Sequence, residues 1–469
     1  MKIIGEKVYQ KIRQNVITNE IYNYLYSIFF NLKKKNNNKK EFYSRISEIN
    51  IDDYIEVNKK PDLNIVIIII DCLRYSELSS HGYHLNTTPF LDSFPINLKA
   101  ISTSPHTYTS VPSILTGLYP HNHGAIISGR IKNFDLLRNL KKIKKDVISL
   151  PEILYFLGYE IYFASSISTA YYPFRDRVLY PKLFPNIKAN IIFKQFKKWV
   201  LKKKSSFFAY LHLYDLHGPI NPPIKYRNYF AKVERIKNIQ GWDFLEFAQQ
   251  NGKEFEKYKK NKILLYDNTL RYLDSSIKKL YSFFQRNNLL NSTIFVITAD
   301  HGEEFWEYHN LEANNFYDPR GFHGVGHGHN VFNNIIEVPL LLSGPGIPKE
   351  TNTNVSTADI MPTILELLRI KYKIKFDGKN IFKEDNNKRL LLSEAISFGF
   401  EKKALIYGRY KLIYSKNDNI SWIFDLKKDP NELNPINDKE INSIFLNKLL
   451  NLYTISEKNK IHKSLEKIQ

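Results

Sequence analysis

The chain has 469 residues, of which 43% are hydrophobic and 14% aromatic. This length has room for one large α/β domain with a smaller partner, and the composition excludes an intrinsically disordered chain. Lys and Arg exceed Asp and Glu by 21, which favours anionic partners. However, Lys, Asn and Ile are abundant along the whole chain, and no zinc-finger or RNA-binding signature is present, so we expect no nucleic-acid partner.

The only cysteine is Cys72, which excludes an intrachain disulfide and a zinc site built from several cysteines. No apolar stretch is long enough for a signal peptide or a membrane-spanning helix, since the longest aliphatic run covers residues 65–70. We therefore expect a cytoplasmic protein.

Residues 1–60 are predicted to form an N-terminal helical and basic extension. Within it, residues 19–40 join an aromatic-rich segment to a run of lysines and asparagines. One interpretation is an interfacial helix that gives peripheral contact with an anionic membrane surface. The other is a helix packed on the following domain, with a solvated loop after it.

The clearest strand covers residues 64–71, which are β-branched and apolar without alternation. Such a pattern indicates burial on both faces, and hence a central strand of a mostly parallel sheet. Three further strands are predicted at residues 207–215, 291–300 and 337–343. Asp71 and Asp300 end two of these strands, where open α/β sheets collect their functional residues.

Helical patterns alternate with the strands, at residues 149–157 and 266–284. This alternation predicts a layered α/β/α domain over residues 61–365. Beyond it, the apolar segments become short, at residues 404–414 and 422–426. They predict antiparallel strands in a smaller C-terminal α+β subdomain, residues 366–469, which ends in a helix.

The aspartates at the strand ends suggest a metal site. A buried carboxylate is costly unless it is paired or bound to a cation, so Asp71, Asp300 and the adjacent His301 together predict a hard divalent ion. The alternative for either aspartate alone is a helix cap.

Two further histidines lie in loops suited to a bound anion. His217 follows the strand at 207–215 and can contact an anion or protonate a leaving group, or simply hydrogen-bond to the backbone. His327 belongs to the stretch His323-Gly-Val-Gly-His-Gly-His-Asn330, whose glycines allow close approach to a ligand. We expect a substrate loop there rather than a zinc cluster.

Several motifs, taken in order, resemble the sulfatase family of the alkaline phosphatase superfamily. Asp71-Cys-Leu-Arg is similar to the family's Asp-Asp-Leu-Arg, and Thr298-Ala-Asp-His-Gly-Glu to its Thr-Ser-Asp-His-Gly-Glu. The eight matching segments are residues 71–74, 87–92, 113–124, 211–219, 298–303, 327–340, 359–363 and 423–432. The resemblance spans roughly residues 62–430. It implies an alkaline-phosphatase-like α/β/α sandwich and an enzyme with a metal-bound nucleophile.

The nucleophile segment departs from the family pattern. Sulfatases carry Cys/Ser-x-Pro-x-Arg, whose first residue becomes formylglycine. Matching the proline places Ser110 first, and ungapped spacing from Leu115-Thr-Gly places Thr107 first. We prefer Thr107, because threonine is the nucleophile of related phosphoethanolamine and phosphoglycerol transferases. The arginine is missing in either register, so we expect no formylglycine.

The resemblance therefore implies one divalent ion held by Asp71, Thr107, Asp300 and His301. Its identity as Ca, Mn or Zn is open, because Cys72 replaces the second aspartate of the family's calcium site. We predict a hydrolase that cleaves a sulfate or phosphate ester of a glycan or lipid headgroup, with catalytic residues Thr107, His217 and His327 and with phosphoester chemistry favoured. The alternatives are a membrane-associated phosphoglycerol- or phosphoethanolamine-type transferase and an inactive anion- or glycan-binding relative.

Overall fold

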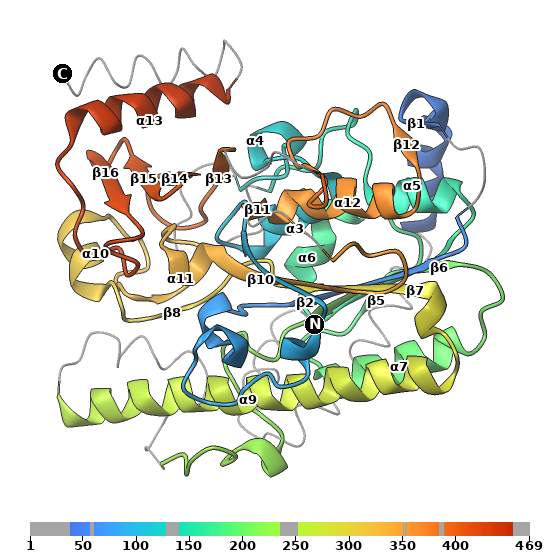
Figure 1. Ribbon diagram of the computed structural model, residues 1–469, viewed down its shortest axis with the longest axis horizontal. Coiled ribbons are helices and arrows are strands. Elements are labelled where there is room, and N and C mark those ends of the chain that lie inside the picture. The colour runs from blue at the N-terminus through green and yellow to red at the C-terminus, as the bar shows by residue number, and fades with distance from the viewer. Residues whose placement is uncertain are drawn as a thin grey trace, which may run out of the picture.

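The computed structural model describes residues 38–56, 61–127, 140–234, 252–349, 351, 354–383 and 389–453. An eight-stranded sheet lies at its centre, with helices on both faces (Figure 1). One face carries α7 (Ala189–Val200) and α9 (Lys253–Arg286). The other carries α3 (Thr107–Thr116), α5 (Leu150–Phe156), α6 (Ser168–Tyr171) and α12 (Ile360–Leu367). The α/β/α sandwich predicted from the sequence is thus confirmed.

The strands of the large sheet are ordered β11-β3-β10-β7-β2-β6-β4-β5. Of these eight, only β10 runs antiparallel to its neighbours. Their bounds are β2 (Asn64–Ile70), β3 (Ile96–Ile101), β4 (Glu160–Ser165), β5 (Lys182–Leu183), β6 (Phe207–Leu213), β7 (Thr293–Thr298), β10 (Glu337–Ser343) and β11 (Val355–Ser356). Every residue of β2 is buried, because the strand has a neighbour on each side and helices on both faces. A mostly parallel sheet with β2 at its centre matches the prediction.

Helix α9 begins 13 residues earlier than the predicted 266–284 helix. Its sheet-packing part carries buried residues such as Tyr266, Leu273 and Phe284. The earlier turns are mainly polar, and their aromatic residues pack instead against Trp306, whose ring lies 5.4 Å from that of Phe255. The apolar period that marks the sheet-packing part is therefore weak in the first turns.

The described part of the N-terminal segment is attached to the main domain. A helix over residues 38–47 leads to β1 (Ile55–Glu56), which pairs with β12 (Lys371–Tyr372). Arg45 forms a salt bridge of 2.9 Å with the buried Glu152 of α5. The predicted membrane-contact segment, residues 19–40, lies outside the described residues except for its last three.

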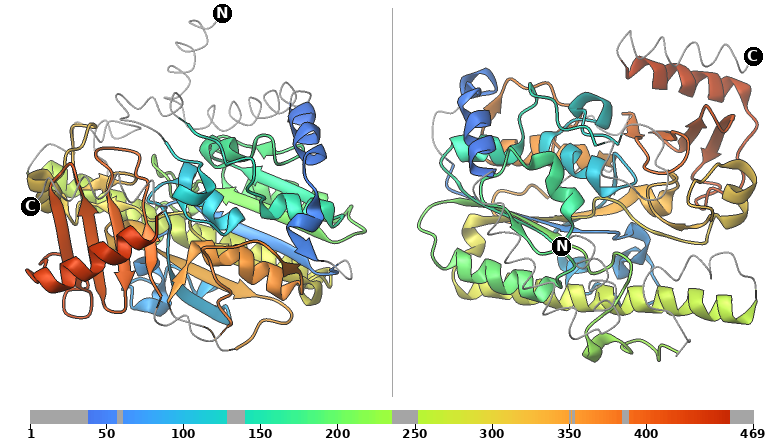
Figure 2. Two further views of the ribbon diagram at one scale, coloured as in Figure 1. Left: turned by 90° about the horizontal axis from the view of Figure 1, so that it is seen from above. Right: turned by 180° about the vertical axis from the view of Figure 1, so that it is seen from behind.

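The C-terminal part forms a four-stranded antiparallel sheet, β13 (Leu391–Ser393), β14 (Lys403–Tyr407), β15 (Tyr410–Ser415) and β16 (Ile420–Asp425), followed by α13 (Lys439–Asn451). This sheet and α13 stand at one end of the molecule (Figures 1 and 2). Phe332 and Ile335 share one buried cluster with Ile413 and Phe424 of the small sheet. Contacts join the residues before and after both predicted domain limits, at residues 60 and 365. These limits therefore stay predictions.

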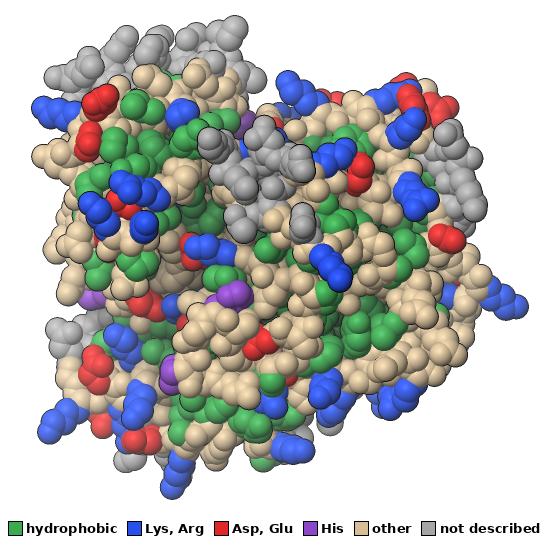
Figure 3. All heavy atoms as spheres, in the orientation of Figure 1, with side chains coloured by type: hydrophobic (Ala, Val, Ile, Leu, Met, Phe, Trp, Pro, Cys, Tyr) green, Lys and Arg blue, Asp and Glu red, His purple; other side chains and the backbone are tan. Residues whose placement is uncertain are grey.

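The remaining α-helices and strands are α4 (Pro120–His123), α10 (His309–Asn315), α11 (Asn333–Ile336), and the two-residue strands β8 (Glu304–Phe305) and β9 (Val325–Gly326). None of the helices in the described ranges has the length and apolar character needed to cross a bilayer. On the face drawn in Figure 3, Lys and Arg side chains are scattered over the surface and do not gather in one patch.

Candidate active site

Two neighbouring parallel strands bring the predicted aspartates together. Asp71 directly follows β2, and Asp300 follows β7 by two residues. Both side chains are fully buried, as is His301. Thr107 lies beside these residues as the first residue of α3. The edge of the sheet formed by the strand ends is therefore lined with polar groups.

The four predicted metal-site residues lie within contact of one another. The Thr107 hydroxyl oxygen is 3.1 Å from Nε2 of His301 and 3.4 Å from Oδ2 of Asp71. Nε2 of His301 is also 3.5 Å from Oδ1 of Asp71 and 3.4 Å from Oδ2 of Asp300. Nδ1 of His301 lies 2.9 Å from the carbonyl of Gly302. A neutral His301 thus keeps its proton on Nδ1 and offers the Nε2 lone pair to the cluster.

This arrangement fits a divalent cation. Oδ2 of Asp300 is buried without a hydrogen-bond partner, which is costly for a carboxylate oxygen unless a cation satisfies it. Ligand atoms of Asp71, Asp300 and His301 all lie within 4.8 Å of one another. Oxygen ligands with one imidazole suit Mn²⁺ and Zn²⁺ as well as harder ions.

His212 is a site residue that the sequence prediction left without a role. It lies within β6, with Nε2 at 3.2 Å from Oδ2 of Asp71 and 3.6 Å from Oδ2 of Asp300. Its Nδ1 is 2.8 Å from the hydroxyl of Tyr210. The sequence signal that could have identified His212 is a histidine within an otherwise apolar strand. An imidazole buried in a sheet core needs a polar partner.

The charges of the site favour ionised carboxylates. Burial acts to raise the pKa of Asp71, but the hydrogen bond from His212 and the charges of His301 and His217 outweigh it and hold that pKa well below its usual value. Burial opposes protonation of His301, whereas Asp300 and Asp71 raise its pKa. A carboxylate pair that attracts positive charge this strongly is suited to a cation.

The structure separates the two nucleophile candidates. Thr107 contacts the Asp71–His301 cluster, while Ser110 lies one helical turn further along α3 with its hydroxyl buried and without a hydrogen-bond partner. The 10-residue helix α3 begins at Thr107 and ends at Thr116, and the following Gly117, with a φ of 68°, caps it. Its N-terminal N–H groups and dipole favour an anion next to the Thr107 hydroxyl.

His217 and His327 stand beside this cluster. The His327 ring lies 4.2 Å from the His301 ring and 5.2 Å from the His217 ring, measured between centroids. Nδ1 of His327 is 2.9 Å from Oε2 of Glu303, and its side chain is 20% exposed. Nδ1 of His217 faces the carbonyl of Gly218. Both histidines therefore lie next to the buried cluster of Asp71, Asp300 and His301.

A sequence profile described as Sulfatase matches residues 63–370 of the chain. The match covers well over half of the sequence and includes every predicted site residue. The chain belongs to the sulfatase family. The family is part of the alkaline phosphatase superfamily and consists of ester hydrolases.

Known relatives of this sulfatase-family chain are distant. An arylsulfatase of Clostridium perfringens is 24% identical over 255 residues, which cover 50% of each chain. The structure of a 2-O GAG sulfatase has a TM-score of 0.63 and 16% identity and covers 86% of this chain and 94% of its own. A phosphonate monoester hydrolase of Agrobacterium radiobacter has a TM-score of 0.61 and 15% identity, with coverages of 87% and 96%. The matched region spans about half or less of the curated relatives' length.

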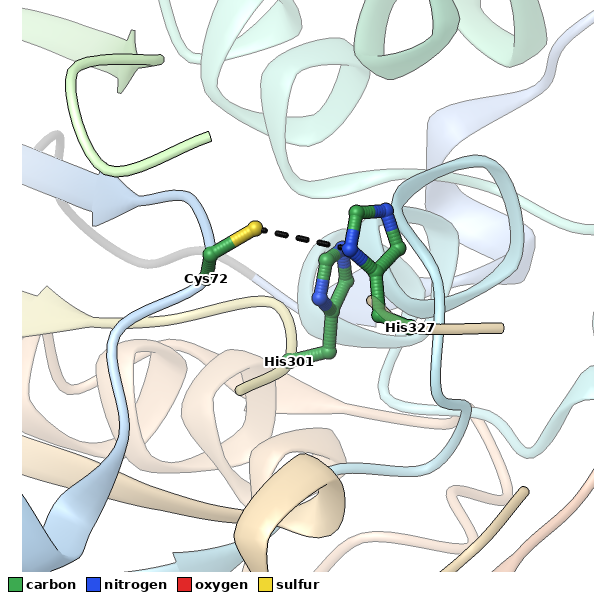
Figure 4. Close-up of side chains that lie close together, drawn as sticks. All are labelled: Cys72, His301 and His327. Atoms are coloured by element: carbon green, nitrogen blue, oxygen red, sulfur yellow. Dashed lines mark hydrogen bonds between the residues drawn. The ribbon is translucent and has the colours of Figure 1, made fainter. Parts of the chain in front are cut away.

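A thiol also lies at the site. Cys72, adjacent to Asp71, is fully buried, and its sulfur is 3.0 Å from Oδ1 of Asp71 and 3.6 Å from Nδ1 of His327. Figure 4 shows the thiol pointing toward His327, with the His301 ring beside it. Burial, followed by the charges of Asp71 and Glu303, raises the pKa of this thiol well above its usual value. In the absence of a metal the thiol is therefore protonated.

Proposed function

We propose that this chain is a metal-dependent hydrolase that cleaves a phosphate or sulfate ester, with phosphoesters favoured and with Thr107 as the nucleophile. The observation that carries the proposal is the position of the Thr107 hydroxyl. It lies at the start of α3, 3.1 Å from Nε2 of His301 and 3.4 Å from Oδ2 of Asp71. One oxygen nucleophile therefore faces a candidate metal site on one side and a helix N-terminus on the other.

Asp71, Asp300 and His301, together with the Thr107 oxygen, would hold the ion. When bound, a divalent cation lowers the pKa of a coordinated hydroxyl and screens an anionic substrate. The N–H groups at the start of α3 would donate hydrogen bonds to the equatorial oxygens of the tetrahedral anion. His212 would hold both aspartates in position through the contacts of its Nε2 to their Oδ2 atoms.

Phosphoester chemistry is favoured by the nucleophile itself. A formylglycine hydrate releases sulfate by breakdown of its hemiacetal, and a threonine ester has no such route. The Thr107 oxygen forms a bond to phosphorus while the bond to the leaving oxygen breaks, and water must then attack phosphorus to release Thr107. The likeness in fold to a phosphonate monoester hydrolase supports this choice.

His217 and His327 are proposed to serve the substrate. Their rings flank the open side of the cluster, where one donates a hydrogen bond to the anion and the other a proton to the leaving alkoxide. Burial and the nearby His301 lower the pKa of His327, against the opposing charge of Glu303. Since Nδ1 of His327 faces the carboxylate of Glu303, a neutral His327 carries its proton on Nδ1, and it donates to the substrate through Nε2 only when both nitrogens are protonated.

The ester is proposed to belong to an anionic glycan or a lipid headgroup. Support for a glycan comes from the fold shared with a 2-O GAG sulfatase.

Replacing Thr107 by alanine tests the nucleophile. We expect turnover of phosphate monoesters, phosphodiesters or aryl sulfates to fall at least about 10³-fold, because the covalent route is lost. Intact-mass and peptide analysis of the unmodified chain during turnover should show a phosphoryl or sulfuryl group on the peptide that contains residue 107. Ser110→Ala is the matched control and should keep most of the activity. Full activity of Thr107→Ala, or an adduct on Ser110, would refute the assignment.

The absent arginine and the presence of Cys72 favour a second candidate, an inactive relative that binds an acidic glycan. In that case the aspartates would serve no purpose at the site, although Asp71, Asp300 and His301 remain in contact. The divalent-metal content of the purified chain separates the two: retention of an ion supports the hydrolase, and its absence after incubation with Mn²⁺ or Zn²⁺ supports the inactive relative.

A further inference from the structure

A second group of metal-ligating side chains lies directly beside the Asp71–Asp300–His301 cluster. Nδ1 of His327 is 3.6 Å from the sulfur of Cys72 and 2.9 Å from Oε2 of Glu303. Cys72 and Glu303 are almost completely buried. A thiol, an imidazole and a carboxylate thus lie together, although Cys72 follows β2, His327 lies in the glycine-rich loop and Glu303 follows β7, far apart in the sequence.

The spacing of the sulfur and the imidazole nitrogen suits a tetrahedral ion. Zinc bonds of about 2.3 Å to sulfur and about 2.0 Å to nitrogen place two ligand atoms roughly 3.5 Å apart, close to the observed 3.6 Å. The backbone supports the same conclusion, because Cys72 has a φ of 62°. This left-handed conformation is uncommon for a residue with a side chain and recurs at functional sites.

This group is distinct from the first, because His301 cannot serve both. Nε2 of His301 already faces Asp71, Asp300 and Thr107, and its Nδ1 faces the carbonyl of Gly302. The second set therefore consists of Cys72, His327 and Glu303. Asp71 lies between the two sets, with Oδ1 at 3.0 Å from the sulfur and Oδ2 at 3.4 Å from the Thr107 hydroxyl.

We propose that Cys72, His327 and Glu303 bind a second divalent ion, of the thiophilic class to which Zn²⁺ belongs. Binding breaks the S–H bond, forms a sulfur–metal bond and releases the proton to solvent. Three protein ligands leave a fourth position for water or a substrate oxygen. Nδ1 of His327 takes the ion, which leaves Nε2 for the substrate contact proposed above. The partly exposed His327 gives the ion a way in from the surface.

The sulfur ligand also gives the second site a preference among metals. Thiolate favours Zn²⁺, Co²⁺ and Cd²⁺ over Ca²⁺, Mg²⁺ and Mn²⁺, which prefer oxygen. Replacing the family's second aspartate by Cys72 thus changes a calcium-type ligand into a thiophilic one. This inference deepens the proposed function, since it adds a second ion to the same centre.

Cobalt titration of the metal-stripped full chain tests the proposal. We expect two equivalents of Co²⁺ to bind, and one of them to give the near-ultraviolet absorption of a thiolate–cobalt bond. Cys72→Ser should bind about one equivalent and lose that absorption. Asp300→Asn should weaken the first ion and keep the thiolate absorption. Unfolding curves of each variant check that it remains folded, and Cys72→Asp offers an oxygen ligand of similar reach if the serine variant is unstable.

Binding of a single equivalent by the unmodified chain, with or without thiolate absorption, would overturn the proposal. So would binding of two full equivalents by Cys72→Ser. Neither result bears on the Thr107 adduct, so the second ion and the proposed hydrolase can fail independently. Loss of all cobalt in Asp300→Asn would show one shared ion, which also excludes the second site.

Discussion

At the scale of single residues, the centre depends on groups that hold the candidate ligands in position. His212 contacts both aspartates and is itself fixed by the Tyr210 hydroxyl at 2.8 Å from its Nδ1. The hydroxyl fixes which imidazole nitrogen faces the carboxylates. Groups of this kind, which contact a ligand rather than the ion, commonly change metal affinity 10- to 100-fold on mutation, as an order of magnitude.

Tyr210→Phe should therefore weaken the binding of the first ion by roughly 10-fold. Only the hydroxyl is removed, and the ring still stacks on Phe163 at 4.4 Å. The measurement is competition with a chelator of known affinity. Tyr159→Phe is the matched control, because Tyr159 donates to the carbonyl of Leu63 at the opposite end of the sheet. Equal metal affinity of the two variants would contradict a positioning role for Tyr210.

The residues that could be predicted from sequence are those that end strands. Asp71, Asp300 and His301 follow buried apolar runs, and the spacing to the Thr-Gly turn placed Thr107. His212 could not be placed in the same way, because a position inside β6 becomes part of the site only when β6 lies next to β2. For Cys72 the sequence indicated only the loss of a calcium ligand. Its contact with His327 could not be predicted, because that loop is 255 residues away.

At the scale of elements, α5 illustrates how one buried charge can join three segments. Glu152 accepts from Arg45 and Arg177, each at 2.9 Å, and from the N–H of Ser149, which caps the helix. Glu152 is fully buried. The helix over residues 38–47 is therefore attached to the main domain by a charge network rather than by apolar contacts alone.

Glu152→Gln should lower the free energy of unfolding by about 3 kcal/mol, because two buried arginines lose their counter-charge. Denaturant unfolding measures the change. Glu366→Gln removes an exposed partner of Lys383 at 3.3 Å and is expected to cost no more than about 1 kcal/mol. A small effect of Glu152→Gln, similar to that control, would argue against the network as an anchor.

Prediction at the element scale succeeded where the local pattern was strong. The strands at residues 64–71 and 337–343 and the helix at 149–157 correspond to β2, β10 and α5. Strands β3 and β4 were not predicted, since charged or half-buried residues interrupt their apolar runs. The early turns of α9 pack on Trp306, a tertiary contact that carries no local signature.

At the scale of the whole molecule, a buried polar cluster joins the end of the glycine-rich loop to β8 and α10. His329 is 3.0 Å from Oε2 of Glu304 and 3.2 Å from Oε1 of Glu312, and all three are buried. Asn330 donates to both glutamates. These side chains are close enough to hold an ion, but both carboxylates already interact with His329 and Asn330, so we assign the cluster a structural role; only Nδ1 of His329 is left buried without a hydrogen-bond partner.

Stability should fall as the pH rises above neutrality. Burial and Arg320 oppose protonation of His329, but Glu312 and Glu304 outweigh them and raise its pKa to about 9. An unfolded histidine has a pKa of about 6.5. The folded state therefore binds the proton more tightly, and this contribution is complete below about pH 6.5 and is lost as the pH rises through 9.

Comparison of melting temperatures between the native chain and His329→Gln measures this effect. The difference in melting temperature should be largest near pH 6 and should become smaller toward pH 9.5. The corresponding change in the free energy of unfolding is on the order of 3 kcal/mol at its largest. A gap that stays constant over this range would show that the charge of His329 does not contribute to stability.

The sequence by itself determined the candidate site residues and the segments that form the core, because burial and strand ends leave a local pattern of apolar runs closed by polar residues. The order of the strands was decided only by the tertiary structure. That order makes β2, β6 and β7 neighbours, so that His212 lies under both aspartates and Cys72 meets His327 and Glu303. Contacts between distant segments depend on how whole faces pack, and no local pattern records that packing.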